Sequence, residues 1–111
     1  MTDANNTPTK ETPSNITLSD LIGLIESGIP FSLLDVREAH EWDTGHLEGA
    51  QLIPLGKLLN SPECLKDINR AAPVVVYCQH GIRSMNAARY LQDQGFDTFN
   101  LLVDWSQLDR S

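Results

Sequence analysis

The chain has 111 residues, of which 41% are hydrophobic, enough apolar surface for one compact domain and too little for two. Fifteen acidic residues against eight basic ones give a formal net charge of −7, which disfavours nucleic acid or an anionic membrane surface as a partner. The N-terminus shows no apolar signal segment and no run approaches the roughly 20 apolar residues of a membrane span, so we expect a cytoplasmic protein.

The first residues, 1–15, are rich in Thr, Asn and Pro and show no hydrophobic periodicity. We therefore expect a disordered tail over 1–15 and a single domain over 16–111. A capping-box pattern, Thr17 with Asp20 three residues later, comes before apolar residues at helical spacing. It predicts a short amphipathic helix that ends at Gly28.

The remaining segments alternate between short apolar runs and amphipathic stretches, separated by Gly, Pro or charged residues. We expect strands at 31–36, 50–53, 74–77 and 98–101, and helices at 38–42, 55–60, 63–69, 84–94 and 105–110. Strands that alternate with helices predict an α/β domain around a mostly parallel sheet.

The clearest chemical signal is Cys78, which directly follows the apolar strand at 74–77. Parallel α/β sheets place their ligand sites at the carboxyl ends of strands. The loop that follows Cys78 consists of Gln79, His80, Gly81, Ile82 and Arg83. Such a loop can turn successive N–H groups inward and form an anion cradle at the start of the next helix. Helix N-termini and nearby cations lower the pKa of a cysteine from about 8.5 to between roughly 3.5 and 7.5, so Cys78 is predicted to be a nucleophile.

Two stretches resemble the single-domain rhodaneses, the thiosulfate sulfurtransferase family. LLDVREAHEWDTGHLEGAQLIPL, residues 33–55, is similar to the first family signature, and YCQHGIRS, residues 77–84, is similar to its active-site loop. The resemblance covers residues 16–110 and implies a rhodanese-like fold: a mostly parallel sheet of about five strands with helices on both faces. It also implies that Cys78 is the catalytic residue and carries a persulfide.

The resemblance further implies that the loop from Gln79 to Arg83 binds the substrate, with Arg83 on the anionic donor. One segment departs from the family pattern. Where the family usually has Leu-x-Gly-Gly before a helix with Trp, this chain reads Leu101, Leu102, Val103, Asp104, with Trp105 three residues early and Leu108 in the usual Trp place.

Other polar residues near these motifs are assigned supporting roles. Asp35 and Arg37 either line the mouth of the site or form a structural ion pair, and the second reading is favoured. Ser84, at the start of the helix that follows the loop, is also a supporting residue. Cys64 is expected to be an inert helix residue. The histidines lack metal-ligand spacing with a cysteine or carboxylate cluster, so no metal and no organic cofactor are expected.

Three functions remain open at this point. The first is a sulfurtransferase that moves sulfur from a small anionic donor such as thiosulfate, through Cys78, to cyanide or a thiol. The second is a persulfide carrier or protein-binding module that takes sulfur from, or gives it to, a protein partner. The third and least favoured is a cysteine-dependent phosphatase, because Cys78 and Arg83 are separated by four residues and the phosphatase loop has five. In each case we expect a monomer.

Overall fold

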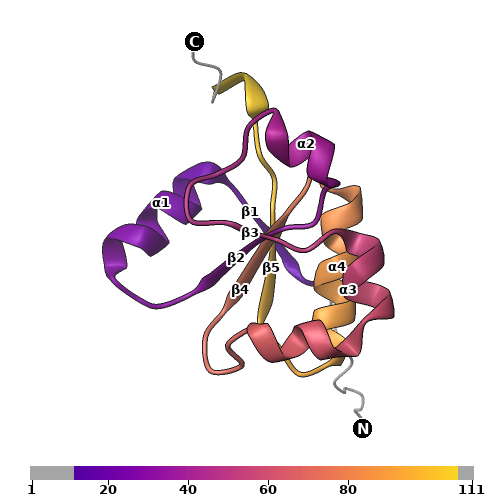
Figure 1. Ribbon diagram of the computed structural model, residues 1–111. Helices are drawn as coiled ribbons and strands as arrows, with labels where there is room; N and C mark the ends of the chain where they lie inside the picture. Colours follow the sequence, from indigo (N-terminus) through magenta and orange to yellow (C-terminus); the bar gives the residue numbers. More distant parts are fainter. Residues whose placement is uncertain (1–11, 108–111) are drawn as a thin grey trace, which may run out of the picture.

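The computed structural model describes residues 12–107, which form an α/β domain built on one parallel sheet (Figure 1). The sheet has five strands in the order β1-β5-β4-β2-β3, and every adjacent pair is parallel. The strands are β1 Ser14–Ile16, β2 Ser32–Asp35, β3 Gln51–Leu52, β4 Val74–Tyr77 and β5 Thr98–Leu101. The predicted fold class is therefore confirmed.

Helices cover both faces of the sheet (Figure 1). They are α1 Leu18–Ser27, α2 Ala39–Asp43, α3 Leu55–Asn60 and α4 Ile82–Asp93, with 3₁₀ segments η1 Pro62–Asp67 and η2 Trp105–Gln107. Because side chains alternate across a strand, Leu33 and Val75 face α1, whereas Leu34 and Val76 face α3 and α4. Among the described helices, none has the length and hydropathy that a bilayer span requires.

Helix α1 forms for the reason that the sequence suggests. The hydroxyl oxygen of Thr17 accepts a hydrogen bond from the Asp20 N–H at 3.1 Å, and the Asp20 carboxylate accepts one from the Thr17 N–H at 2.9 Å. The helix ends at Gly28, whose φ of 77° lies in the left-handed region that glycine tolerates. Leu21 of this helix is buried against the sheet.

Strand β1 corrects one prediction. Ser14 and Asn15 fall within the predicted tail of 1–15, yet together with Ile16 they pair with β5 in parallel register. The segment has no apolar alternation because it is an edge strand, and the hydrogen bonds of its backbone come from β5 rather than from its own sequence pattern. Residues 1–11 lie outside the described part, and disorder there stays a prediction.

Three predicted helices differ in type or extent. The segment expected at 63–69 is the 3₁₀ helix η1; Pro62 opens it, and it stops where Ile68 turns to extended backbone. Helix α4 begins at Ile82, two residues before the predicted start, because Gly81 adopts a left-handed φ of 90° at the N-cap. Of the helix expected at 105–110, the 3₁₀ turn η2 covers the described part, and the rest lies beyond residue 107.

The parallel arrangement brings the candidate residues to one edge. Asp35 at the end of β2 lies opposite Tyr77 at the end of β4, and Cys78 comes directly after Tyr77. The end of β5 at Leu101 lies on the other side of β4. The carboxyl edge of the sheet therefore gathers the loop after Cys78 and the segment after β5.

Candidate active site

Cys78 is only 2% exposed and lies at the junction of β4 and the loop that starts α4. Its Sγ accepts hydrogen bonds from the backbone N–H of Gly81 at 3.1 Å and of Ser84 at 3.2 Å. Ser84 is the third residue of α4, and the first N–H groups of a helix have no partner inside the helix. The sulfur takes the place of such a partner, so the loop and the helix start form a cradle for negative charge.

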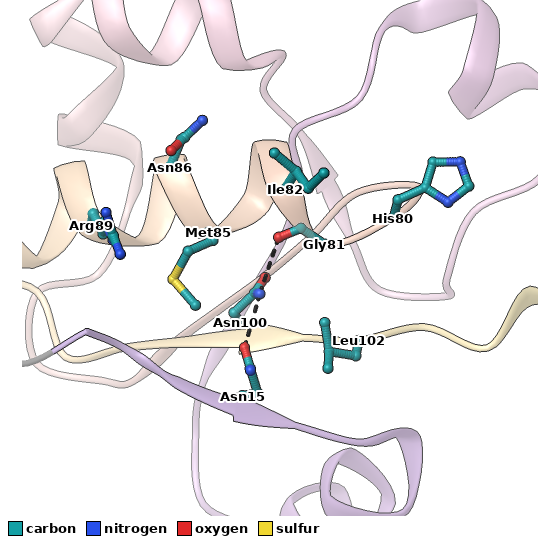
Figure 2. Close-up of a pocket in the computed structure, with 9 residues that line it drawn as sticks. All are labelled: Asn15, His80, Gly81, Ile82, Met85, Asn86, Arg89, Asn100 and Leu102. Atoms are coloured by element: carbon teal, nitrogen blue, oxygen red, sulfur yellow. Dashed lines mark hydrogen bonds between the residues drawn. The ribbon is translucent and has the colours of Figure 1, made fainter.

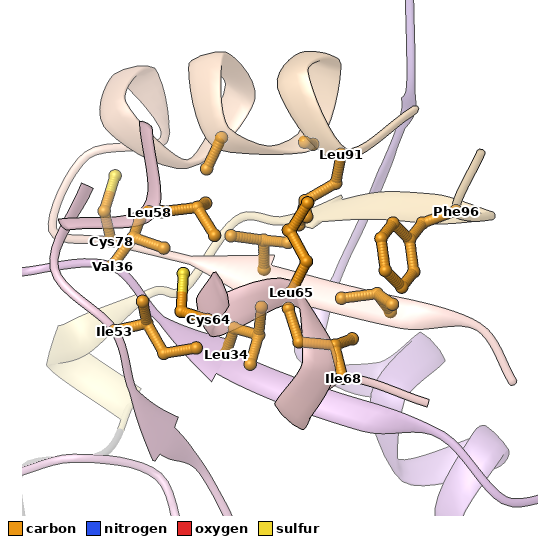
Figure 3. Packing of buried hydrophobic residues seen from close by; sticks show 14 residues of the cluster. Leu34, Val36, Ile53, Leu58, Cys64, Leu65, Ile68, Cys78, Leu91 and Phe96 are labelled. Carbon is orange, nitrogen blue, oxygen red and sulfur yellow. The ribbon is translucent and has the colours of Figure 1, made fainter. Parts of the chain in front are cut away.

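The two cysteines have opposite electrostatic environments. Burial raises the pKa of Cys78, but hydrogen bonds with the Ser84 side chain and from the N–H groups of Ser84, His80 and Gly81 outweigh this and leave the pKa below its ordinary value. Burial raises the pKa of Cys64, which lies in the same core cluster under α3 and α4 (Figure 3). Only Cys78 is therefore prepared to act as a thiolate.

The shape of the loop depends on Gly81. Its φ of 90° is in the left-handed region, and a Cβ at this position would lie 2.7 Å from Cδ2 of Leu102. Leu102 directly precedes Val103 and Asp104, the two residues that stand where the family usually has Gly-Gly. An apolar side chain of the segment after β5 thus lies directly against the loop.

The side chains of the loop point in different directions. His80 and Ile82 are exposed, and in Figure 2 the His80 ring points away from the other labelled residues. The loop borders a shallow hollow of about 350 Å³, which is also lined by Met85, Arg89 and Leu102 but not by Cys78. The predicted loop residues therefore surround Cys78 mainly with backbone groups, and the side chains of His80 and Ile82 face outward.

Asp35 and Arg37 form the structural ion pair that the sequence favours. Both are buried, and the guanidinium donates to both Asp35 oxygens, with Nη2 at 2.8 Å from Oδ2. The same guanidinium donates to the Gln79 side-chain oxygen at 3.2 Å and to the carbonyl of Gly45 at 2.7 Å. This pair therefore braces the first residue of the loop.

Arg83 lies at the end of the loop but is not free. Its guanidinium donates to both oxygens of Glu41, in α2, at 2.7 and 2.8 Å. The Arg83 hydrogen bonds hold the pKa of Glu41 down at about 2, so the carboxylate stays charged at neutral pH. The cation that the sequence assigns to the donor is thus balanced by a carboxylate.

Two residues of the site were missed by the sequence analysis. The hydroxyl of Ser84 donates to Oδ1 of Asn100, a buried residue of β5. The indole N–H of Trp105 donates to the carbonyl of Gln79 at 3.0 Å, and its ring lies 4.6 Å from the Arg37 guanidinium. A polar Asn inside an otherwise apolar strand is the one signal that could have identified Asn100.

The comparisons with known proteins agree with this geometry. The model of the rhodanese-like domain matches residues 17–108. The chain belongs to the rhodanese-like domain family. Residues 1–16 and 109–111 lie outside the match, and the family resemblance seen in the two motifs is confirmed.

Relatives in this rhodanese-like family include sulfurtransferases. The chain is 39% identical over 98 residues to a probable adenylyltransferase/sulfurtransferase MoeZ of Mycobacterium tuberculosis, which covers 85% of this chain but only 25% of that protein. It is 34% identical to the thiosulfate sulfurtransferase GlpE of Shewanella oneidensis, over 75% of this chain and 78% of that one. A rhodanese-like domain protein of Staphylococcus aureus superposes with a TM-score of 0.72 at 28% identity, over 80% and 84% of the two chains. The chain is thus a rhodanese-like member of the sulfurtransferase family.

Proposed function

We propose that this rhodanese-like domain transfers a sulfane sulfur from thiosulfate, or a similar small anionic donor, to a thiophilic acceptor through a persulfide on Cys78. The observation that carries the proposal is the pair of backbone N–H groups of Gly81 and Ser84 directed at Cys78 Sγ. These groups favour an anion at the sulfur without a metal or an organic cofactor.

The reaction has two steps. The Cys78 thiolate attacks the outer sulfur of thiosulfate, the sulfur–sulfur bond of the donor breaks, and sulfite leaves with the electron pair. The negative charge of the enzyme now lies on the outer sulfur of the persulfide, and the loop residues from Gln79 to Arg83 surround it. Cyanide or a thiolate then attacks that outer sulfur, and the Cys78 thiolate is regenerated.

The donor is assigned from charge. Arg83 is the cation at the end of the loop, and Glu41 holds its guanidinium in a defined position. A dianionic donor gains from this guanidinium to the extent that the Glu41 carboxylate leaves its charge available. The name of the Shewanella relative, a thiosulfate sulfurtransferase that this chain covers to 78%, supports the same donor.

A persulfide carrier served by a protein donor or acceptor is the second candidate. Ile82 is 73% exposed and Leu102 is 44% exposed, and both flank the hollow beside the loop (Figure 2). Apolar side chains at this place suit contact with a protein better than contact with a small anion. Slow turnover of thiosulfate, together with fast transfer from a protein persulfide, would favour this candidate.

The proposed setting of the protein follows from its chemistry. A nucleophilic thiol at Cys78 and a second free thiol at Cys64 suit a reducing compartment, so we place the protein in the cytoplasm. We propose that it works as a monomer, without nucleic acid or membrane as partner. A phosphatase is disfavoured because four residues, not five, separate Cys78 from Arg83.

The experiment is mass spectrometry after brief exposure to thiosulfate. We expect the peptide with Cys78 to gain the mass of one sulfur atom and the peptide with Cys64 to remain unchanged, because only the first thiol has a lowered pKa. Cys64→Ser is the matched control and should load normally. Sulfur on Cys64 alone would overturn the assignment, and aryl phosphate hydrolysis that disappears in Cys78→Ser would replace it with a phosphatase.

A further inference from the structure

Asn100 is a buried polar side chain whose hydrogen bonds reach the nucleophile in two steps. It is 2% exposed and lies in β5, opposite Val76 of β4 and Asn15 of β1. Its amide joins three partners, the Ser84 hydroxyl, the Gly81 carbonyl and the Asn15 side chain. Within residues 12–107 no hydrogen bond joins Asn100 to Cys78 itself, so any influence on the sulfur passes through its neighbours.

The orientation of the amide is determined by Gly81. A carbonyl oxygen can only accept, and the Gly81 carbonyl lies 3.2 Å from Asn100 Nδ2. The amide nitrogen therefore faces the loop and Asn15, as the dashed lines in Figure 2 show. The amide oxygen then faces Ser84 and accepts the hydroxyl proton.

This orientation decides what the Ser84 hydroxyl offers to the sulfur. Its Oγ lies 3.3 Å from Cys78 Sγ. While the hydroxyl donates its proton to the Asn100 oxygen, Oγ presents lone pairs to the sulfur, and these suit an S–H group that donates. A thiolate needs the proton turned toward it. That rotation would leave the buried Asn100 oxygen without a donor, which costs free energy.

We propose that Asn100 is a positioning residue that acts through Ser84 and favours the states in which Cys78 Sγ carries no charge. The thiol is one such state. If the proposed function holds, the persulfide is a second such state. Its charge lies on the outer sulfur, so the Ser84 hydroxyl can again donate to the Asn100 oxygen. Asn100 thus opposes the backbone N–H groups of the cradle and destabilises only the free thiolate.

Other charged or titratable groups near Cys78 are Arg83 with its partner Glu41, the Asp35–Arg37 pair and His80. They contribute to the field at the sulfur in the parent and in variants at position 100 alike. Differences between these proteins therefore report on the Ser84–Asn100 interaction.

The test is the rate of Cys78 alkylation by iodoacetamide as a function of pH, followed by mass spectrometry of the Cys78 peptide. In Asn100→Leu the amide oxygen is absent and the Ser84 proton is free to turn to the sulfur. We expect the pKa of Cys78 to fall by about half a unit to one unit, the effect of one net hydrogen bond. Asn100→Ala is a second variant with the same expectation, in case leucine disturbs the loop.

Ser84→Ala separates this role from a merely structural one. If Asn100 acts through Ser84, Asn100→Leu no longer changes the pKa of Cys78 when the protein also carries Ser84→Ala. Asn15→Ala removes only the outer hydrogen bond of the amide and should leave the pKa of Cys78 unchanged. An unchanged or raised pKa in the folded Asn100 variants would overturn the proposal, and so would a decrease that persists without the Ser84 hydroxyl.

The persulfide part rests on the proposed function and is measured separately. At a pH above the pKa of both proteins, with thiosulfate and added sulfite at equilibrium, the ratio of persulfide to thiolate should be about three- to tenfold lower in Asn100→Leu than in the parent. An equal ratio would overturn the persulfide part. If the parent forms no persulfide, the proposed function fails, whereas the alkylation experiment, which needs no sulfur donor, still decides the role of Asn100.

Discussion

At the scale of single residues, the site depends on backbone groups, and Gly81 determines where they point. Its N–H reaches the sulfur, and its carbonyl orients Asn100, so a single peptide unit serves both the nucleophile and its supporting network. Since φ at this residue is 90°, a side chain here strains the backbone before it meets any neighbour. Gly81 is therefore the position at which a small change should have the largest effect.

We predict that Gly81→Ala lowers the free energy of unfolding by about 1–2 kcal/mol, the cost of a left-handed conformation for a residue with a Cβ. The new Cβ would also lie 2.7 Å from Leu102, whose side chain must move. Persulfide formation on Cys78 should fall with it, because the N–H of residue 81 shifts. Urea unfolding and thiosulfate turnover measure the two effects.

Gly23→Ala is the matched control for this variant. Gly23 lies inside α1, and a Cβ there meets nothing within 4 Å. The same substitution should stabilise the protein by roughly 0.5–1 kcal/mol and leave turnover unchanged. If both variants behaved alike, the special backbone of Gly81 would have no role in the site.

The residues that could be predicted are those whose roles follow from neighbours in the sequence. Cys78 and its loop are contiguous, and Asp35 and Arg37 are only two residues apart. Asn100 and Trp105 reach the loop from 19 and 26 residues away, by contacts that exist only after the sheet has formed. For the same reason the missing Gly-Gly at residues 103–104 could be noticed in the sequence, but the contact of the preceding Leu102 with the loop could not be predicted.

At the scale of elements, α2 and the start of α4 are joined by the pair Glu41–Arg83. Their side chains are 21% and 35% exposed, so solvent weakens the pair and we expect it to contribute no more than about 1 kcal/mol to stability. The pKa of Glu41 is lowered from 4.5 to about 2 by Arg83, and this contribution is therefore present above pH 4.5 and disappears as the pH falls through 2. At neutral pH the pair limits the positive charge that a donor meets.

We predict that Glu41→Gln lowers the KM for thiosulfate about two- to fivefold, because Arg83 then keeps its full charge for the anion. Arg83→Ala should have the opposite effect and lower kcat/KM about ten- to a hundredfold, as expected for the loss of a charged hydrogen bond. Glu48→Gln makes the same change of net charge at an exposed residue elsewhere and is the control. Weaker thiosulfate use in Glu41→Gln would mean that Glu41 serves to hold Arg83 in place and that the free charge is of no benefit.

Elements also show where sequence patterns stop being informative. The four apolar strands and α1 were predicted because their side chains follow the periodicity of the structure in which they are buried. Strand β1 was not, because it is an edge strand with one apolar residue, Ile16, and is held by the backbone of β5. The early start of α4 was missed because Gly81 reads equally well as a loop residue and as an N-cap.

At the scale of the whole molecule, Tyr77 joins several segments at the carboxyl end of the sheet, where it is the last residue of β4. It is fully buried, its hydroxyl oxygen accepts the Leu47 N–H at 3.0 Å, and its ring lies 6.0 Å from Trp105 and 5.7 Å from the Arg37 guanidinium. One side chain therefore connects the central strand with the segment after α2 and with the segment after β5. These two segments flank the loop that holds Cys78, so the stability of the domain and the geometry of its site depend on the same contact.

Two effects of Tyr77→Phe test this role. At neutral pH the variant leaves the Leu47 N–H without its acceptor, and we expect its free energy of unfolding to fall by about 1 kcal/mol, a decrease of roughly 4–8 °C in Tm.

The second effect depends on pH. Burial raises the pKa of Tyr77 above its ordinary value of 10, so the stability that the neutral phenol contributes to the parent is complete below pH 10 and is lost as the pH rises further. The variant lacks this group, and the gap in Tm between the two proteins should therefore narrow from pH 9 to pH 11. Tyr90→Phe removes the other tyrosine hydroxyl, which makes no hydrogen bond within residues 12–107, and should keep the Tm of the parent at neutral pH. If the difference in Tm between the parent and Tyr77→Phe stays constant up to pH 11, the Tyr77 phenol ionises in the folded protein without loss of stability. Its buried hydrogen bond with the Leu47 N–H then does not have the role assigned to it.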